Sequence, residues 1–151
     1  MILIASDHGG LELKQAVKQM LEGRGIEVRD LGAISNDSVD YPDFGAKVAS
    51  GVSRGEADQG ILICGTGIGM SIVANKFPRV RAALVSDEFT ARMAKEHNNA
   101  NILVLGGRTQ SPPRGVGLVQ VWLDALFEGG RHQQRLDKIA RLEEDLGSGR
   151  G

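Results

Sequence analysis

The stretch ILICGTGIGMS, residues 61–71, joins an apolar run to a loop with glycine at every second position. The run at 61–63 is typical of a strand that is buried on both faces, as strands of parallel sheets are. Glycines at 65, 67 and 69 break that pattern where a helix is expected to start. A strand, a glycine loop and a helix in this order predict a β–α unit whose helix N-terminus faces the loop.

Four further apolar runs alternate with segments of helical spacing and extend this unit in both directions. We expect strands at 2–6, 26–32, 60–64, 80–86 and 100–107. We expect helices at 11–21, 40–55, from the glycine loop to about 75, at 87–99, from 112 to about 128, and at 131–146. Asp87 is expected to cap its helix, because an aspartate side chain can bond the first free N–H groups. The alternation predicts an α/β fold with a five-stranded parallel sheet covered by helices on both faces.

Length and composition predict a single domain without a membrane or nucleic-acid partner. The chain has 151 residues, of which 41% are hydrophobic, and its formal net charge is −1. We expect one domain over 1–146, followed by a flexible polar tail at 147–151. No apolar stretch approaches the roughly 20 residues that cross a bilayer, no basic leader precedes the first strand, and the single cysteine fits a reducing compartment. These observations predict a soluble cytoplasmic protein.

Polar and glycine residues directly follow several of the expected strands. They are Asp7 and His8 after the first strand, 64–69 after the third, Asp87 after the fourth, and 106–108 after the fifth. Ligands of parallel α/β sheets bind outside the carboxyl ends of the strands, so these residues are candidates for a binding site. His97 and Asn98 end the helix at 87–99 and reach this edge only from another subunit or through a bend of the chain.

The glycine loop does not match the two best-known phosphate-binding loops. It lacks the lysine and the Ser/Thr of a P-loop, and Met70 stands where a dinucleotide fingerprint needs its third glycine. Free N–H groups at a helix N-terminus still favour an anion. The loop is therefore either an anion site or a tight strand-to-helix turn. Asp87, about 20 residues further on, keeps a ribose-binding interpretation open.

Cys64 begins the loop and is the single cysteine of the chain. A lone buried cysteine most often packs as a small hydrophobe. A thiol at a strand end that faces a helix N-terminus instead has a lowered pKa and can act as a nucleophile or a base. Both interpretations stay open on these residues alone, as do structural and catalytic interpretations of His8 and His97.

Arg131 and Arg135 lie four residues apart at the start of the last expected helix, with no acidic residue at 127 or 139 to pair with them. Two guanidinium groups on one helix face suit a phosphate, although a solvated basic turn has the same pattern. The same helix carries an apolar stripe that suits docking on a partner subunit. The stripe consists of Leu136, Ile139, Leu142 or Ala140, and Leu146. The scattered histidines and the one cysteine have no metal-ligand spacing, and no G-x-S-x-G elbow of a hydrolase is present.

These segments together resemble the ribose-5-phosphate isomerase B family, which also includes allose and galactose 6-phosphate isomerases. The resemblance rests on SDHGG at 6–10, DYPDF at 40–44, GILICGTGIGMSIVANK at 60–76, EHNNANILVLGGR at 96–108 and EGGRHQQR at 128–135. It implies a Rossmann-like three-layer α/β/α sandwich whose C-terminal helix docks on a partner subunit. It also implies a homodimer or a dimer of dimers, active sites between the subunits, and no metal or other cofactor.

The resemblance implies catalytic roles for four residues. Cys64 would be the base that moves a proton between C1 and C2 of the open-chain sugar. Thr66 would help to move hydroxyl protons. His97, expected from the neighbouring subunit, would help to open the furanose ring, with Asp7 assisting at ring or hydroxyl oxygens.

The resemblance also implies three kinds of contact that hold the substrate. Backbone N–H groups would bind the negative enediolate, polar side chains would line the sugar, and cationic side chains would gather round the phosphate. The residues are, in that order, Gly65, Gly67 and Gly69; Tyr41 and Asn98; and His8, Arg108, Arg131 and Arg135.

Met70 bears on the identity of the base. A second branch of the family lacks the cysteine and uses a glutamate at this position, and a methionine cannot take a proton. We therefore expect Cys64 to be the base of an aldose–ketose isomerase that interconverts ribose 5-phosphate and ribulose 5-phosphate. The alternatives are the same reaction on allose 6-phosphate, galactose 6-phosphate or a tetrose phosphate, a non-catalytic subunit of a hetero-oligomeric isomerase, and a nucleotide-binding Rossmann module.

Overall fold

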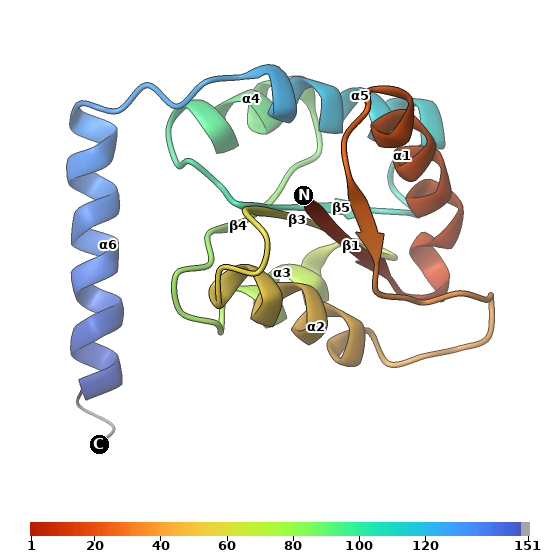
Figure 1. The fold of residues 1–151 in the computed structure, drawn as a ribbon, viewed down its shortest axis with the longest axis horizontal. Helices are drawn as coiled ribbons and strands as arrows, with labels where there is room; N and C mark the ends of the chain where they lie inside the picture. The colour runs from red at the N-terminus through yellow and green to blue at the C-terminus, as the bar shows by residue number, and fades with distance from the viewer. Residues whose placement is uncertain (149–151) are drawn as a thin grey trace.

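The computed structural model describes residues 1–148 and contains one sheet of five parallel strands (Figure 1). The strands are β1 (Ile2–Ser6), β2 (Val28–Asp30), β3 (Gln59–Cys64), β4 (Ala82–Leu84) and β5 (Ile102–Gly106). Their spatial order is β2-β1-β3-β5-β4, so β3 is central and the two shortest strands form the edges. The expected parallel sheet is confirmed, although the edge strands are shorter than the apolar runs at 26–32 and 80–86 predicted.

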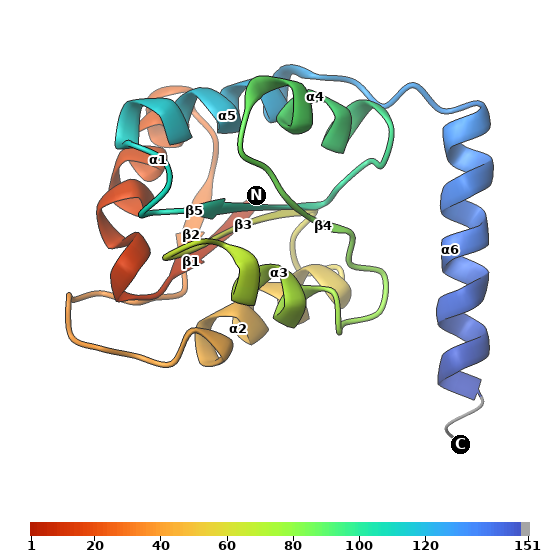
Figure 2. The same cartoon turned by 180° about the vertical axis from the view of Figure 1, so that it is seen from behind.

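Helices cover both faces of the sheet and give the expected three layers (Figures 1 and 2). They are the short 3-10 helix η1 (His8–Gly10), α1 (Leu11–Gly23), α2 (Tyr41–Ser53), α3 (Ile68–Ala74), α4 (Glu88–Glu96), α5 (Pro112–Asp124) and α6 (Arg131–Ser148). Helices α1, α4 and α5 lie on one face, and α2 and α3 on the other. Asp87 caps α4 through a reciprocal pair of bonds with Thr90, as predicted. Helix α5 ends at Asp124, earlier than the predicted end near 128.

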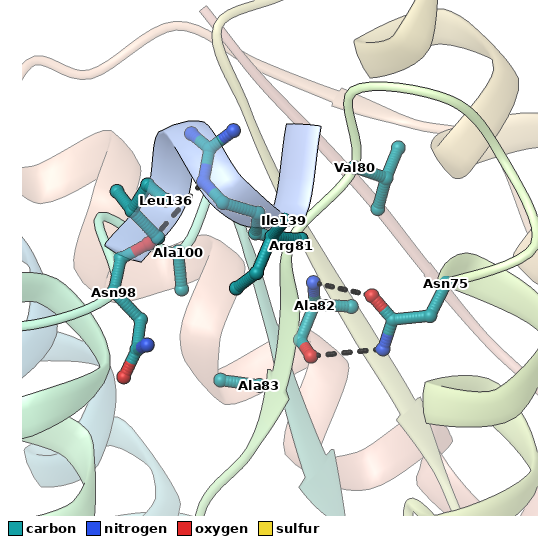
Figure 3. Close-up of a pocket in the computed structure, with 9 residues that line it drawn as sticks. All are labelled: Asn75, Val80, Arg81, Ala82, Ala83, Asn98, Ala100, Leu136 and Ile139. Carbon is teal, nitrogen blue, oxygen red and sulfur yellow. Dashed lines mark hydrogen bonds between the residues drawn. The ribbon is translucent and has the colours of Figure 1, made fainter. Parts of the chain in front are cut away.

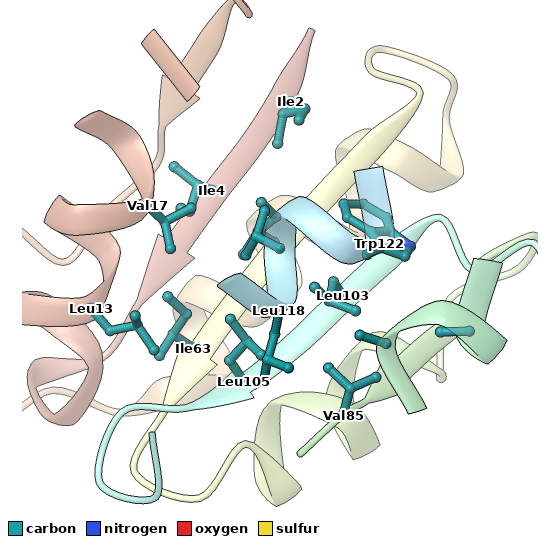
Figure 4. Close-up of a cluster of buried hydrophobic side chains, with 14 of the residues drawn as sticks. Ile2, Ile4, Leu13, Val17, Ile63, Val85, Leu103, Leu105, Leu118 and Trp122 are labelled. Carbon is teal, nitrogen blue, oxygen red and sulfur yellow. The ribbon is translucent and has the colours of Figure 1, made fainter. Parts of the chain in front are cut away.

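Side chains of the three inner strands alternate between two apolar clusters. Odd positions of β3, such as Ile61 and Ile63, pack with Trp122 beneath α1, α4 and α5 (Figure 4). Even positions, Leu62 and Cys64, pack on the side of α2 and α3. Because both faces are covered, these strands are apolar except for Ser6 and Gln59 at strand ends, which explains the long hydrophobic runs in the sequence.

Helix α6 belongs to neither layer and stands beyond the end of the sheet at which the strands begin, next to β4 (Figures 1 and 2). Leu136 is buried, but Ile139, Leu142 and Leu146 are each more than half exposed. The backbone N–H of Arg79 donates to the Glu143 carboxylate on this helix. The predicted tail at 147–151 begins inside α6, and its positions after 148 lie outside the described residues. Among residues 1–148, no helix combines the length and the apolarity that crossing a membrane requires.

The edge strand β4 is bound on its open side by a side chain. The Asn75 amide donates to the Ala82 carbonyl at 3.0 Å and accepts from the Ala82 N–H at 3.0 Å, so it imitates the backbone of a neighbouring strand. These two bonds satisfy backbone groups that an edge strand otherwise presents to solvent.

A buried lysine ties α1 to β2 and to the segment that leads to α2. Lys14 has no exposed surface, and its ammonium donates to Asp30 Oδ1 at 3.0 Å and to the Ala33 carbonyl. Lys18 donates to the second oxygen of Asp30 at 3.1 Å, and the Gly32 N–H donates to the first at 2.9 Å. Burial raises the pKa of Asp30, but these hydrogen bonds outweigh it and hold the pKa below its usual value.

Replacement of Asp30 by asparagine is expected to destabilise the fold at neutral pH. Asp30→Asn leaves the fully buried Lys14 without its carboxylate, which costs about 3 kcal/mol of the free energy of unfolding. Since the folded pKa of Asp30 is depressed, its contribution is present above the unfolded pKa of about 3.9 and is lost as the pH falls through the folded value. Urea unfolding at pH 7 and near pH 3 should therefore show a difference that shrinks in acid.

Asp124→Asn is the matched control, because Asp124 pairs with Arg24 at 2.7 Å in an exposed position. Loss of this ion pair should lower the free energy of unfolding by less than about 1 kcal/mol. Equal losses in the two variants would contradict a special role for the buried lysine.

Candidate active site

Backbone hydrogen bonds join the loops that follow β1, β3 and β5. The Asp7 N–H donates to the Ile63 carbonyl at 3.1 Å. The N–H groups of Gly107 and Arg108 donate to the carbonyls of Cys64 and Gly65 at 2.8 and 2.9 Å. The carboxyl ends of three neighbouring strands therefore form one continuous surface, where ligands of parallel α/β sheets bind.

The glycines of the 65–69 loop let larger side chains lie against the backbone. A Cβ on Gly65 would lie 3.5 Å from the Arg108 guanidinium, and a Cβ on Gly69 would overlap the Tyr41 ring. Gly9 packs in turn against Gly65. The structure thus brings nine of the residues predicted for the site together, which we call the carboxyl-edge group. The group consists of Asp7, His8, Tyr41, Cys64, Gly65, Thr66, Gly67, Gly69 and Arg108.

Three polar side chains of this group have fixed backbone partners. Asp7 Oδ1 accepts from the Gly9 N–H at 2.9 Å and starts η1. Thr66 Oγ1 accepts from the Ile68 N–H at the start of α3. His8 Nδ1 accepts from the Val39 N–H, so the proton of the neutral ring is on Nε2, which can donate to an anionic ligand.

Cys64 ends β3 and lies directly before the glycine loop. Only 4% of its surface is exposed, and its side chain belongs to the apolar cluster that also holds Met70. Cys64 therefore does pack as a small hydrophobic residue, as the first interpretation predicted. Its position at the strand end also puts the thiol at the boundary between the core and the carboxyl-edge surface.

The remaining predicted residues, His97, Asn98, Arg131 and Arg135, lie at the opposite end of the sheet; we call them the amino-edge group. His97 is the C-cap of α4, and the Asn98 carbonyl accepts from the Arg81 side chain just before β4. A few residues on, the Asn101 carbonyl accepts from the Gly60 N–H near the start of β3. The length of β3 separates this end from Cys64 by on the order of 17 Å. In a single chain the two groups therefore cannot contact one small sugar.

A cluster of His97, Glu128 and His132 lies within the amino-edge region. Glu128 Oε1 is 3.3 Å from His97 Nε2 and 3.7 Å from His132 Nε2. The two imidazole rings are stacked with centroids 4.1 Å apart. Burial lowers the pKa of His132, and the neighbouring positive charges of His97 and Arg131 lower it further.

This cluster was not predicted from the sequence. Glu128 and His132 are four residues apart, which is a usable signal within EGGRHQQR. His97 comes from a different helix, and no spacing rule connects it to the other two.

A cavity of about 340 Å³ separates α6 from the edge strand β4 (Figure 3). Its lining is mainly apolar and backbone, from Val80, Ala82, Ala83, Ala100, Leu136 and Ile139. Asn98 is the only predicted site residue among the lining residues, and the carboxyl-edge group lies elsewhere. We therefore interpret this cavity as a packing gap beneath α6 and place the candidate active site at the carboxyl ends of the strands.

Comparisons with known proteins find similarity over almost the whole chain. A model of the Ribose/Galactose Isomerase family matches residues 2–139, which include both groups. Ribose-5-phosphate isomerase B of Escherichia coli (strain K12) is 43% identical over 143 residues, covering 95% of this chain and 96% of that protein.

Two solved structures are similar over nearly the whole chain. Ribose-5-phosphate isomerase B of Clostridium thermocellum has a TM-score of 0.93 at 52% identity, covering 96% of this chain and 98% of that chain. Ribose-5-phosphate isomerase B of Mycoplasma genitalium, solved with bound ribulose 5-phosphate, has a TM-score of 0.91 at 47% identity, covering 95% of each chain.

Gly67 is expected to resist substitution by any residue with a side chain. Its φ of +83° lies in the left-handed region, and a Cβ there would lie 3.1 Å from the Leu105 carbonyl. Gly67→Ala should lower the free energy of unfolding by about 1–2 kcal/mol in urea titrations. Gly117→Ala is the control, because its Cβ would meet nothing within 4 Å inside α5, and it should cause no loss. Unchanged stability of Gly67→Ala would contradict the constraint on the loop.

Proposed function

Because the chain belongs to the ribose/galactose isomerase family, we propose that it interconverts ribose 5-phosphate and ribulose 5-phosphate by proton transfer between C1 and C2. The observation that carries this proposal is the cysteine at the head of the glycine loop, in a chain similar over its length to ribose-5-phosphate isomerases B. The ribulose 5-phosphate bound in the Mycoplasma genitalium enzyme supports the choice of a five-carbon substrate.

The proposed reaction moves two protons and changes no oxidation state overall. The Cys64 thiolate takes the proton from C2 of the open-chain aldose, and the electron pair forms a cis-enediolate. The thiol then returns the proton to C1, while Thr66 helps the hydroxyl proton pass from O2 to O1. Backbone N–H groups of the 65–69 loop stabilise the negative charge that exists only during the reaction, so they lower the barrier.

The substrate is held by its phosphate and its hydroxyl groups. His8, Arg108, Arg131 and Arg135 would surround the phosphate, because forked guanidinium groups bind its oxygens bidentately. Tyr41 and Asn98 would line the sugar. His97 would give a proton to the ring oxygen and open the furanose, with Asp7 assisting.

We propose that two copies of the chain complete each site. The support is the separation of about 17 Å between the two groups along β3, which one pentose cannot bridge. The carboxyl-edge group of one copy would face the amino-edge group of the other, and the apolar stripe of α6 would dock on the partner. Exposed apolar side chains beside the glycine loop, Ile68, Ile72 and Leu84, offer a matching surface. We place this homodimer, or a dimer of dimers, in the cytoplasm.

One alternative loses support. In a nucleotide-binding module Asp87 would bind a ribose, but its carboxylate accepts from the Thr90 N–H at 2.7 Å and caps α4. Allose 6-phosphate, galactose 6-phosphate and tetrose phosphates need the same enediolate chemistry, so a substrate panel separates them from ribose 5-phosphate. A non-catalytic subunit would show no turnover with any member of that panel.

Cys64→Ala is expected to remove the base and leave substrate binding largely intact. Turnover of ribose 5-phosphate should fall by about a thousandfold or more, since acid–base groups contribute up to about 10⁴-fold. The measurement is initial rates with pentose, tetrose and hexose phosphates, beside calorimetric binding of ribulose 5-phosphate.

Met70→Leu is the matched control, because Met70 is fully buried in the same apolar cluster and has no proposed part in proton transfer. It should stay within a few-fold of wild type, on the order of other volume-conserving core exchanges. Near wild-type rates in Cys64→Ala would contradict the assignment of Cys64 as the base.

Mixing two inactive variants tests whether the site is shared between copies. A heterodimer of Cys64→Ala and His97→Asn chains has one site with both wild-type residues and one with neither. Random pairing makes half of the dimers mixed, so co-refolded samples should regain about a quarter of wild-type activity. Each variant refolded alone is the control, and a mixture no more active than these would mean that each chain builds its site alone.

A further inference from the structure

We propose that His97, Glu128 and His132 form a binding site for zinc(II), and that zinc bound there inhibits the isomerase. The site brings together three side chains from two helices and the segment between α5 and α6. The inhibition rests on the proposed ring-opening role of His97, whereas the binding itself does not depend on the enzyme's function.

The three ligand atoms are already close enough to share one ion. All lie within 4.8 Å of one another, with Glu128 Oε1 at 3.3 and 3.7 Å from the two histidine Nε2 atoms. An ion near the middle of this triangle needs only small shifts to reach the about 2.0–2.2 Å of zinc–nitrogen and zinc–oxygen bonds. Two imidazoles and one carboxylate leave a fourth position open in a tetrahedral zinc site.

Backbone contacts fix two of the ligands in place. The Glu128 N–H donates to the Glu96 carbonyl at 3.0 Å, which joins the segment before α6 to the end of α4. The His132 N–H donates to the Gly129 carbonyl at 3.0 Å, and only 7% of this residue is exposed. A metal therefore meets a framework that the fold has already ordered, which limits the entropy lost on binding.

His97 is the ligand whose ring can change orientation when the metal binds. The two rings are nearly parallel, with an interplanar angle of 13°, so one must tilt for both nitrogen lone pairs to point at one ion. His97 has a side chain 38% exposed and can turn, whereas His132 is packed.

Occupation of the site would remove His97 from the reaction. An imidazole nitrogen bonded to zinc cannot give a proton to the ring oxygen of the substrate. The ion would also lie beside Arg131, within the region proposed to receive the phosphate. Oxygen-preferring cations such as Mg²⁺ favour carboxylates and water, so they should not compete for this nitrogen-rich site.

The test is calorimetric titration of the full chain with zinc chloride, in a buffer without phosphate or chelator. We expect one zinc ion for each chain, no heat with magnesium, and inhibition of turnover that EDTA reverses. His132→Asn and Glu128→Gln should each weaken zinc binding by on the order of tenfold or more. Glu128 is about half exposed, so its variant remains informative if His132→Asn unfolds.

Cys64→Ala is the control that separates this site from the thiol, which is the competing zinc ligand of the chain. It should bind zinc as the wild type does. Wild-type affinity for zinc in Glu128→Gln, or loss of zinc binding in Cys64→Ala, would overturn the proposal. A chain that binds zinc as expected but isomerises no sugar phosphate would contradict the proposed function and leave the metal site standing.

Discussion

All five strands of the sheet run in one direction, and the site depends on this constraint more than on any single contact. Parallel strands put the loops after β1, β3 and β5 at one edge, where backbone hydrogen bonds join them. The same direction carries the end of α4 and the start of α6 to the other edge. The length of β3 then separates the thiol from the histidine pair, so the groups that the proposed reaction needs lie at two ends of the molecule.

Cys64 is a residue of the core and also the proposed base of the reaction. Its side chain packs with Met70 on the face of α2 and α3, and it is the last residue of the central strand before the glycine loop. A base held in this way has few conformations, which keeps it aligned with the carbon atoms between which the proton moves. The apolar neighbours also exclude water from the place where the enediolate would form.

Much of the fold could be predicted from the sequence because both faces of the inner strands are buried. Continuous apolar runs marked β1, β3 and β5, and Asp87 marked the start of α4 by its capping chemistry. The predicted bounds of the edge strands and of the helix ends were less accurate. Strands β2 and β4 are each paired on one side only, so the residues that flank them stay irregular. Most of the carboxyl-edge group followed from the rule that the loops after parallel strands share one edge, whereas Tyr41 was expected only from the family resemblance. The cluster around Glu128 did not, because it depends on how the segment after α5 returns to the end of α4.

The side chain of Asn75 affects how copies of this chain can associate. Its amide occupies both backbone groups of Ala82 on the open side of β4, so these two groups cannot pair with a strand from another molecule. Association through this side of the protein is therefore expected to use helices and side chains and not a ladder of strands. A sheet that grew from copy to copy would form fibres, and one amide at the rim of the fold opposes that route by binding Ala82 first.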